Sequence, residues 1–302
     1  MRLRLCAILL ILLVELISCV NMVSGKDLAA EYYNLANGYL ALKRYEEAIQ
    51  FYERSLQIDP EQAKASYNLA LACLEAGKAA RACELIEGLL QKDSHNKELL
   101  AFLAYARYLE GQEDVAISLY QKVLELQSED RPALYNLSLI YWRKKDLISA
   151  KTWLDRLLKR NPSDAEALFA YGSLLSEESQ VAEAVEYFKQ YLQLKPQSEA
   201  GYLALAKAYI SLEQYLKALD VLEKVLVLNP KLTEAWFLQA QILLTKAEDP
   251  DRGYTSLEQA VELGFNDKVA LALLLEKVNA TKFLDYEKNR IAVFLKKKNL
   301  LP

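Results

Sequence analysis

A period of 34 residues constrains the fold of this chain more than any other feature of its sequence. Alanine stands at six positions that are each 34 residues apart: Ala48, Ala82, Ala116, Ala150, Ala184 and Ala218. Two further patterns fall on multiples of the same period. These are proline at Pro60, Pro162, Pro196 and Pro230, and the dipeptide Tyr-Asn at 33–34, 67–68 and 135–136. Because three kinds of residue share one period, the chain is built from an internal structural repeat.

Each period has the pattern of two short helices, as residues 165–198 illustrate. The first helix has one apolar face with the spacing i, i+3, i+4 and i+7, formed by Leu168, Tyr171, Gly172 and Leu175. A polar turn over 177–180 separates it from a second helix, which contains Ala184, Phe188 and Tyr191. Pro196 ends the second helix, since proline cannot continue a helix.

Small residues at positions 8 and 20 of the repeat predict a close approach between the two helices of each hairpin. The pairs are Ala36 and Ala48, Ala70 and Ala82, Ala104 and Ala116, Ser138 and Ala150, Gly172 and Ala184, and Ala206 and Ala218.

Composition supports an all-α fold and narrows the classes of function. The chain has only nine glycines and seven prolines, too few for the frequent turns of β-sandwiches or barrels. A single histidine, His95, argues against a histidine-based metal site or a Ser-His-Asp centre, and no nucleotide-binding or zinc motif is present. A pI near 5.4 disfavours nucleic-acid binding. We therefore expect no enzymatic activity, no cofactor and no metal.

The repeated residues resemble the tetratricopeptide repeat. Its pattern of bulky, small and aromatic positions is matched in the first repeat by Tyr32, Leu35, Ala36, Tyr39, Ala48, Tyr52, Ser55 and Pro60. The resemblance implies a right-handed α-solenoid of about seven helix hairpins over 29–265, with repeats starting at 29, 63, 97, 131, 165, 199 and 233. Residues 266–302 fit the repeat poorly, and they read as the C-terminal capping helices that a solenoid needs.

Residues 1–25 have the pattern of a targeting segment. Arg2 and Arg4 precede an apolar run from Leu5 to Val14, and Leu16-Ile17-Ser18-Cys19 resembles the bacterial lipobox, whose cysteine becomes lipidated. This predicts a lipoprotein of the bacterial cell envelope, attached to an extracytoplasmic membrane surface by acyl chains such as palmitate on Cys19. Two alternatives stay open: a single-pass N-terminal anchor over 5–23, and cleavage after Gly25 to release a soluble secreted protein.

Two cysteines fall in the repeats, on neighbouring helices. Free cysteine behaves as a small hydrophobe, so we expect Cys73 and Cys83 to be two buried thiols. A disulfide between them is the alternative in an oxidising compartment.

A second stripe of residues on the first helix of repeats one to four exceeds what burial of one face requires. The resemblance implies that this stripe lines a concave groove that binds partner segments. Its residues are Tyr33, Asn34, Asn37, Tyr67, Asn68, Leu71, Phe102, Tyr105, Tyr108, Tyr135, Asn136, Leu139 and Trp142.

These features together predict a non-enzymatic scaffold that binds an extended or helical segment of a partner protein and serves assembly of an envelope complex. The asparagines Asn37 and Asn68 match those that hold chaperone C-termini in one subfamily. Tyr33, Glu98 and Phe102 replace the basic residues of that site, which argues against a chaperone partner. The alternatives are a lipoprotein partner of a periplasmic transport or secretion system, and a small-ligand binder.

Overall fold

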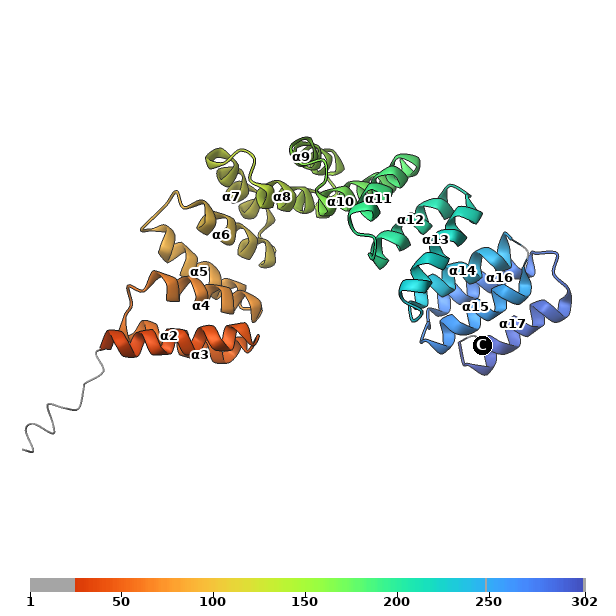
Figure 1. Ribbon diagram of the computed structural model, residues 1–302, viewed down its shortest axis with the longest axis horizontal. Coiled ribbons are helices and arrows are strands. Elements are labelled where there is room, and N and C mark those ends of the chain that lie inside the picture. The colour runs from red at the N-terminus through yellow and green to blue at the C-terminus, as the bar shows by residue number, and fades with distance from the viewer. Residues whose placement is uncertain (1–24, 248, 301–302) are drawn as a thin grey trace, which may run out of the picture. The chain divides into compact units, whose positions relative to one another are not determined.

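The computed structural model of the chain describes residues 25–247 and 249–300, and within these ranges it contains sixteen helices and no strand (Figure 1). The predicted all-α fold is confirmed. Residues 1–24, with Cys19 and the lipobox, lie outside the described residues.

In the described part of the chain seven helix hairpins follow one another, and two further helices come after them. The hairpins are α2(Gly25–Ala41) with α3(Tyr45–Ile58), α4(Ala63–Glu75) with α5(Ala79–Leu90), α6(Lys97–Leu109) with α7(Glu113–Leu126), α8(Arg131–Arg143) with α9(Leu147–Arg160), α10(Ala165–Glu177) with α11(Val181–Leu194), α12(Glu199–Ser211) with α13(Tyr215–Leu228), and α14(Thr233–Thr245) with α15(Pro250–Glu262). The last two helices are α16(Lys268–Asn279) and α17(Asp285–Lys297). From the second hairpin on, the first helix of each pair begins at the residue where the 34-residue count begins.

The helices form two compact units, of which the first ends at Ile140 and the second begins at Tyr141, within α8. In the first unit, α2 packs on α3, α4 on α5 and α6 on α7, and each hairpin also contacts the next one. The second unit repeats this arrangement from α9 to α15, and α16 packs against both α14 and α17. Each unit is therefore a row of hairpins whose contacts are mainly with the nearest neighbours.

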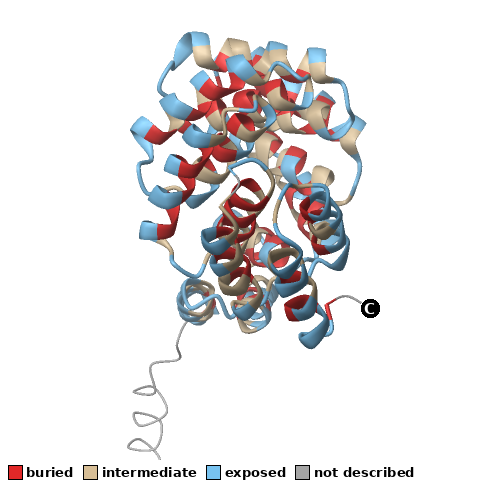
Figure 2. Cartoon of the chain, turned by 90° about the vertical axis from the view of Figure 1, so that its right-hand side faces the viewer, coloured by how far each residue is buried: buried red, intermediate tan, exposed pale blue. Residues whose placement is uncertain are grey.

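The core of each unit lies where successive helices meet, and Figure 2 shows buried residues on these inner faces and exposed residues at the turns. All six alanines at position 20 are fully buried. At position 8, Ala36, Ala70, Ala104 and Ala206 are equally buried, and Ser138 is 1% exposed. The small residues thus stand where the helices pack most closely, as their spacing predicts.

Gly172 occupies position 8 of the fifth repeat because α11 leaves no room for a side chain there. A Cβ atom at this position would lie 2.9 Å from Cε1 of the buried Phe188 ring. Gly38 in α2 is the opposite case, since a Cβ atom there would meet nothing within 4 Å. The two helical glycines therefore differ in the space that an added methyl group would find.

Alanine substitutions at these two glycines are expected to change stability in opposite directions. Gly172→Ala should lower the free energy of unfolding by about 1–3 kcal/mol, because the Phe188 ring must shift. Gly38→Ala should raise it by roughly 0.5–1 kcal/mol, since glycine is a poor helix former. Urea unfolding monitored by circular dichroism measures both changes. Equal effects at the two sites would contradict the packing of α10 against α11.

Leu35 departs from the expected burial of the repeat face. It occupies the leucine position of the first repeat, yet it is 45% exposed, whereas Leu69 and Leu103 at the same position are buried. In the described part of the chain no helix precedes α2, so this face of α2 has no neighbouring hairpin to cover it.

Cys73 and Cys83 are buried free thiols in the structure. The Sγ atom of Cys83 donates a hydrogen bond to Oε2 of Glu110 (3.3 Å), which also accepts one from Nη1 of Arg107 (2.8 Å). Burial raises the pKa of Cys83 to about 12, and the bond to Glu110 adds to this rise. Burial likewise raises the pKa of Cys73 above its ordinary value.

Both thiols are therefore expected to resist alkylation in the folded protein. Iodoacetamide reacts with the thiolate, so at pH 8 the modification of Cys83 should be about a hundredfold slower in the native state than in urea. Peptide mass spectrometry after timed quenching measures both cysteines. Rapid native labelling of Cys83, or a disulfide-linked peptide pair, would contradict the hydrogen bond to Glu110.

Candidate partner-binding surface

The thirteen residues predicted to line the groove lie on the first helices of four repeats, α2, α4, α6 and α8, and none of them is buried. Asn34 and Tyr105 are exposed, and the other eleven are half-buried. Trp142 is the only one of the thirteen beyond Ile140, so it belongs to the second unit. The other twelve belong to the first unit, which therefore presents a partly apolar surface on its first helices.

A hollow of about 600 Å³ lies between α4, the end of α5 and the start of α6. The predicted residues Tyr33, Tyr67 and Asn68 line it, together with Leu89 and Leu99. Its rim carries charges of both signs, from Lys64, Lys92, Asp93 and Glu98. The hollow thus combines an aromatic and aliphatic wall with a polar edge.

A second hollow of about 270 Å³ lies further along the first unit and is lined by four of the predicted residues, Tyr105, Tyr108, Asn136 and Leu139. The rings of Tyr105 and Tyr108 are stacked, with their centroids 6.5 Å apart. Tyr120 and Ile140, which are buried, complete the wall. Seven of the predicted residues are therefore divided between two hollows of one unit.

Asn37 and Asn68 belong to a hydrogen-bond network inside the first unit. The buried Tyr52 donates from Oη to Oδ1 of Asn37 (2.5 Å). Nδ2 of Asn68 donates both to this same Oδ1 atom (3.0 Å) and to Oη of Tyr33 (3.2 Å). Burial raises the pKa of Tyr52 to about 12, so its hydroxyl remains a donor at neutral pH.

Asn136, two repeats after Asn68, bonds its tyrosine directly, since its Nδ2 donates to Oη of Tyr120 (2.9 Å). Asn68 and Tyr52 instead meet at the shared acceptor Oδ1 of Asn37. Burial raises the pKa of Tyr120 well above its ordinary value. Asn68 therefore uses both amide hydrogens within the protein and Asn136 uses one, which leaves the exposed Asn34 with the freest amide for a ligand. The sequence signal for the Asn136 bond is a tyrosine 16 residues before the asparagine, a spacing that Tyr52 and Asn68 share and that the repeat pattern alone does not single out.

The described residues hold no group of three or more His, Cys, Asp or Glu side chains arranged to bind a metal ion. Over the same ranges, 25–247 and 249–300, no helix has the length and apolar character needed to cross a bilayer.

Comparison with known protein families finds the tetratricopeptide repeat in three segments, at residues 29–62, 107–170 and 203–264. A further match, to subunit 3 of the anaphase-promoting complex or cyclosome, spans residues 143–225. No curated protein matches the chain significantly.

Many solved structures share the fold at low sequence identity. A tetratricopeptide repeat protein from Parabacteroides merdae is 19% identical, with a TM-score of 0.59, over 83% of this chain and 98% of its own. The C-terminal part of a repeat protein from Cytophaga hutchinsonii is 17% identical, with a TM-score of 0.65, over 80% of this chain and 98% of its own. YrrB, described as having an unusual peptide-binding site, is 17% identical, with a TM-score of 0.55, over 63% of this chain and 98% of its own.

The repeat period, the row of helix hairpins and these matches agree. Proteins built from this repeat are in general non-catalytic scaffolds for protein–protein interaction, and the fold of this chain fits that role. The chain is a tetratricopeptide repeat protein.

Proposed function

We propose that this protein is a scaffold whose first unit binds an extended or helical segment of a partner protein. The observation that carries the proposal is the pair of hollows on the first unit, whose walls are formed by seven of the residues that the sequence pattern selects. Tyrosine is common where binding energy concentrates in interfaces. The peptide-binding site named for the structural neighbour YrrB adds support by analogy.

The chemistry of the two hollows favours a segment with apolar side chains and few charges. Their walls are mainly tyrosine, leucine and isoleucine, and the rim of the larger hollow carries lysines and acidic residues in equal number. A strongly charged segment would therefore gain little there, whereas apolar side chains could insert against the rings. Asn34 would add hydrogen bonds to the main chain of such a segment.

The proposed location is an extracytoplasmic membrane surface, with the protein held there by a lipid on Cys19, where the scaffold would assist assembly of an envelope complex. The sequence of residues 1–25 supports this part of the proposal through its basic start, its apolar run and its lipobox. With the attachment at the N-terminus, the first unit would be the part of the fold that follows the membrane attachment directly in sequence.

Cross-linking and mass spectrometry on native membranes tests the proposed partner binding. We expect cross-links from Lys64 and Lys92, at the rim of the larger hollow, to one protein that recurs between preparations. Lys159 and Lys224 line neither hollow and provide the comparison. Partner cross-links that occur as often at these two lysines as at the rim would contradict the proposal.

A further inference from the structure

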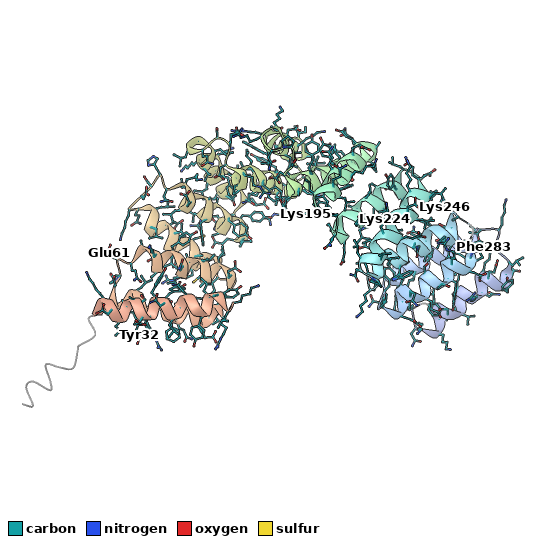
Figure 3. The ribbon with its side chains drawn as sticks, in the orientation of Figure 1. Tyr32, Glu61, Lys195, Lys224, Lys246 and Phe283 are labelled. Atoms are coloured by element: carbon teal, nitrogen blue, oxygen red, sulfur yellow. The ribbon has the colours of Figure 1, made fainter. Side chains whose placement is uncertain are left out.

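A cavity of about 530 Å³ in the second unit lies outside the proposed groove. Its walls come from α12, α13, α14 and the end of α16, and three of its lining residues are lysines, Lys246, Lys277 and Lys282. Figure 3 labels Lys246, just after the last residue of α14, and Phe283, in the turn that follows α16. The cavity is thus bounded by the sixth and seventh repeats and the end of α16.

The three lysines have no carboxylate partner among residues 25–247 and 249–300. Other lysines of the repeats, such as Lys78, Lys97 and Lys207, do pair, with Glu46, Asp130 and Glu234. Within 25–247 and 249–300 no acidic residue lines the cavity, and Glu248 lies outside the described residues. An anion that entered it would meet positive charge that the described protein does not already neutralise.

The negative C-terminal ends of α14 and α16 neutralise only part of the positive charge of the three lysines. A helix C-terminus carries roughly half a negative charge, so these two, together with the C-terminus of α12 at Ile210, offset about one and a half of the three ammonium charges. The segment around Lys277 and Lys282 also has a net positive charge, since residues 266–302 contain eight basic and four acidic residues. Residues 1–265, by contrast, contain 29 basic and 37 acidic ones. Positive charge is therefore concentrated in the segment that closes the cavity.

All three lysine side chains are exposed; an aromatic ring contacts one of them, and local packing orders the turn that carries another. Nζ of Lys246 lies 5.4 Å from the centroid of the Tyr215 ring, which also lines the cavity. The turn that carries Lys282 is fixed by Phe283, which packs against the apolar core of α14 to α17. The same turn is closed by a hydrogen bond from the Thr281 amide to the Val278 carbonyl (2.9 Å).

The donors that face the cavity fit a phosphate group. The hydroxyls of Thr245 and Thr281 already donate to the carbonyls of Gln241 and Val278, both at 2.6 Å, so the lysines are the main donors that remain. Arginine, whose planar fork suits carboxylates, is absent from the lining. A phosphate monoester offers three acceptor oxygens and a charge near −2, which match three ammonium groups that act as point charges.

We infer that this cavity binds a phosphate group, carried either by a small soluble compound or by the headgroup of an anionic lipid. The site is separate from the proposed groove of the first unit, so it can be tested whether or not that groove binds a partner.

Titration calorimetry of the full chain in a non-ionic detergent, with sodium pyrophosphate as the probe, tests the inference. We expect saturable binding at about 0.15 M salt, where exposed charges are largely screened. The K277Q/K282Q variant should bind about tenfold more weakly or worse, since each substitution removes a charge-assisted hydrogen bond.

The control variant is K268Q/K296Q, which removes the same two charges from α16 and α17 at exposed positions that do not line the cavity. Its affinity for pyrophosphate should change by less than about twofold. Absence of saturable binding, or an equal loss in both variants, would overturn the inference. Tighter binding of tetraglutamate than of pyrophosphate would overturn the assignment to phosphate.

Two further probes distinguish the sources of the phosphate. Glycerol 3-phosphate represents a soluble compound, and dihexanoyl phosphatidic acid presents the same group on a short, soluble lipid. Tighter binding of the lipid supports a headgroup, and equal or tighter binding of glycerol 3-phosphate supports a free compound.

Discussion

Replacing Tyr105 and Tyr108 together by alanine is expected to weaken partner binding by more than about 2 kcal/mol, or roughly thirtyfold in Kd. The two stacked rings form one wall of the smaller hollow, and neither side chain is buried in the core. Their removal takes away aromatic contact area but leaves the packing between hairpins intact. The midpoint of the helical melt should therefore stay nearly unchanged.

Two measurements are made on each variant. One is a binding titration with the partner found by cross-linking, and the other is a circular-dichroism melt. Tyr286→Ala is the matched control, because Tyr286 is 67% exposed on α17 and lines neither hollow. It should change neither affinity nor stability by more than about 0.5 kcal/mol. A collapse of the melt in the double variant would mean that the two rings belong to the core, and the groove would lose its main support.

Loss of membrane attachment is the expected result of Cys19→Ala. If Cys19 carries the lipid, the wild-type protein should partition into the detergent phase and incorporate a fatty-acid analogue. Two acyl chains give stable attachment, since each buried methylene contributes about 0.8 kcal/mol. Without the cysteine there is no thiol to carry the acyl chains, so the fatty-acid label and the attachment that depends on it should disappear together.

Cys6→Ala provides the control, because Cys6 precedes the lipobox and is removed with the signal when Cys19 becomes the N-terminal residue. Fractionation followed by mass spectrometry of the N-terminal peptide separates the alternatives. A wild-type protein purified from the membrane with an intact Met1 would instead support the single-pass anchor over 5–23.

The repeat pattern was sufficient to predict the fold because the two helices of every repeat pack against each other in the same way. Positions 8 and 20 need small residues wherever two helices cross closely, and Ala150 and Ala184 are fully buried as that requirement demands. Leu35 shows the limit of the argument. Its position in the repeat predicts burial, but burial also depends on a preceding hairpin, which the described chain lacks before α2.

The polar side chains of the candidate surface were harder to predict from the sequence. The spacing places Asn68 on the correct helix, but it does not reveal that both amide hydrogens are used by Tyr33 and Asn37. Such bonds depend on the distance between helices from different repeats, which a one-dimensional pattern does not contain.

The lysines that line the cavity of the second unit were not predicted from the sequence, for a different reason. They belong to the seventh repeat and the capping segment, where the 34-residue pattern weakens, and they converge only because α16 packs against α14. The sequence draws attention instead to Lys296, Lys297 and Lys298, of which the first two lie in the last turn of α17 and complement that helix terminus.

Two contacts between neighbouring repeats couple substitutions at two positions: the direct bond of Asn136 to Tyr120, and the meeting of Tyr52 and Asn68 at Oδ1 of Asn37. If one partner alone is replaced, a buried polar group loses its hydrogen bond, which costs about 1–3 kcal/mol, whereas replacement of both by apolar residues is nearly neutral. Substitutions at position 24 and, 16 residues later, at position 6 of the next repeat are therefore expected to occur as pairs. Both kinds of pair occur in the chain. The polar pairs are Tyr52 with Asn68, which meet through Asn37, and Tyr120 with Asn136, which bond directly. The apolar pairs are Ile86 with Phe102, Leu154 with Ala170, Phe188 with Ala204, and Leu222 with Leu238. At each of these junctions the two positions are therefore either both polar or both apolar. A repeat moved to a new place in the array would need the matching residue, at position 24 or position 6, changed in its new neighbour.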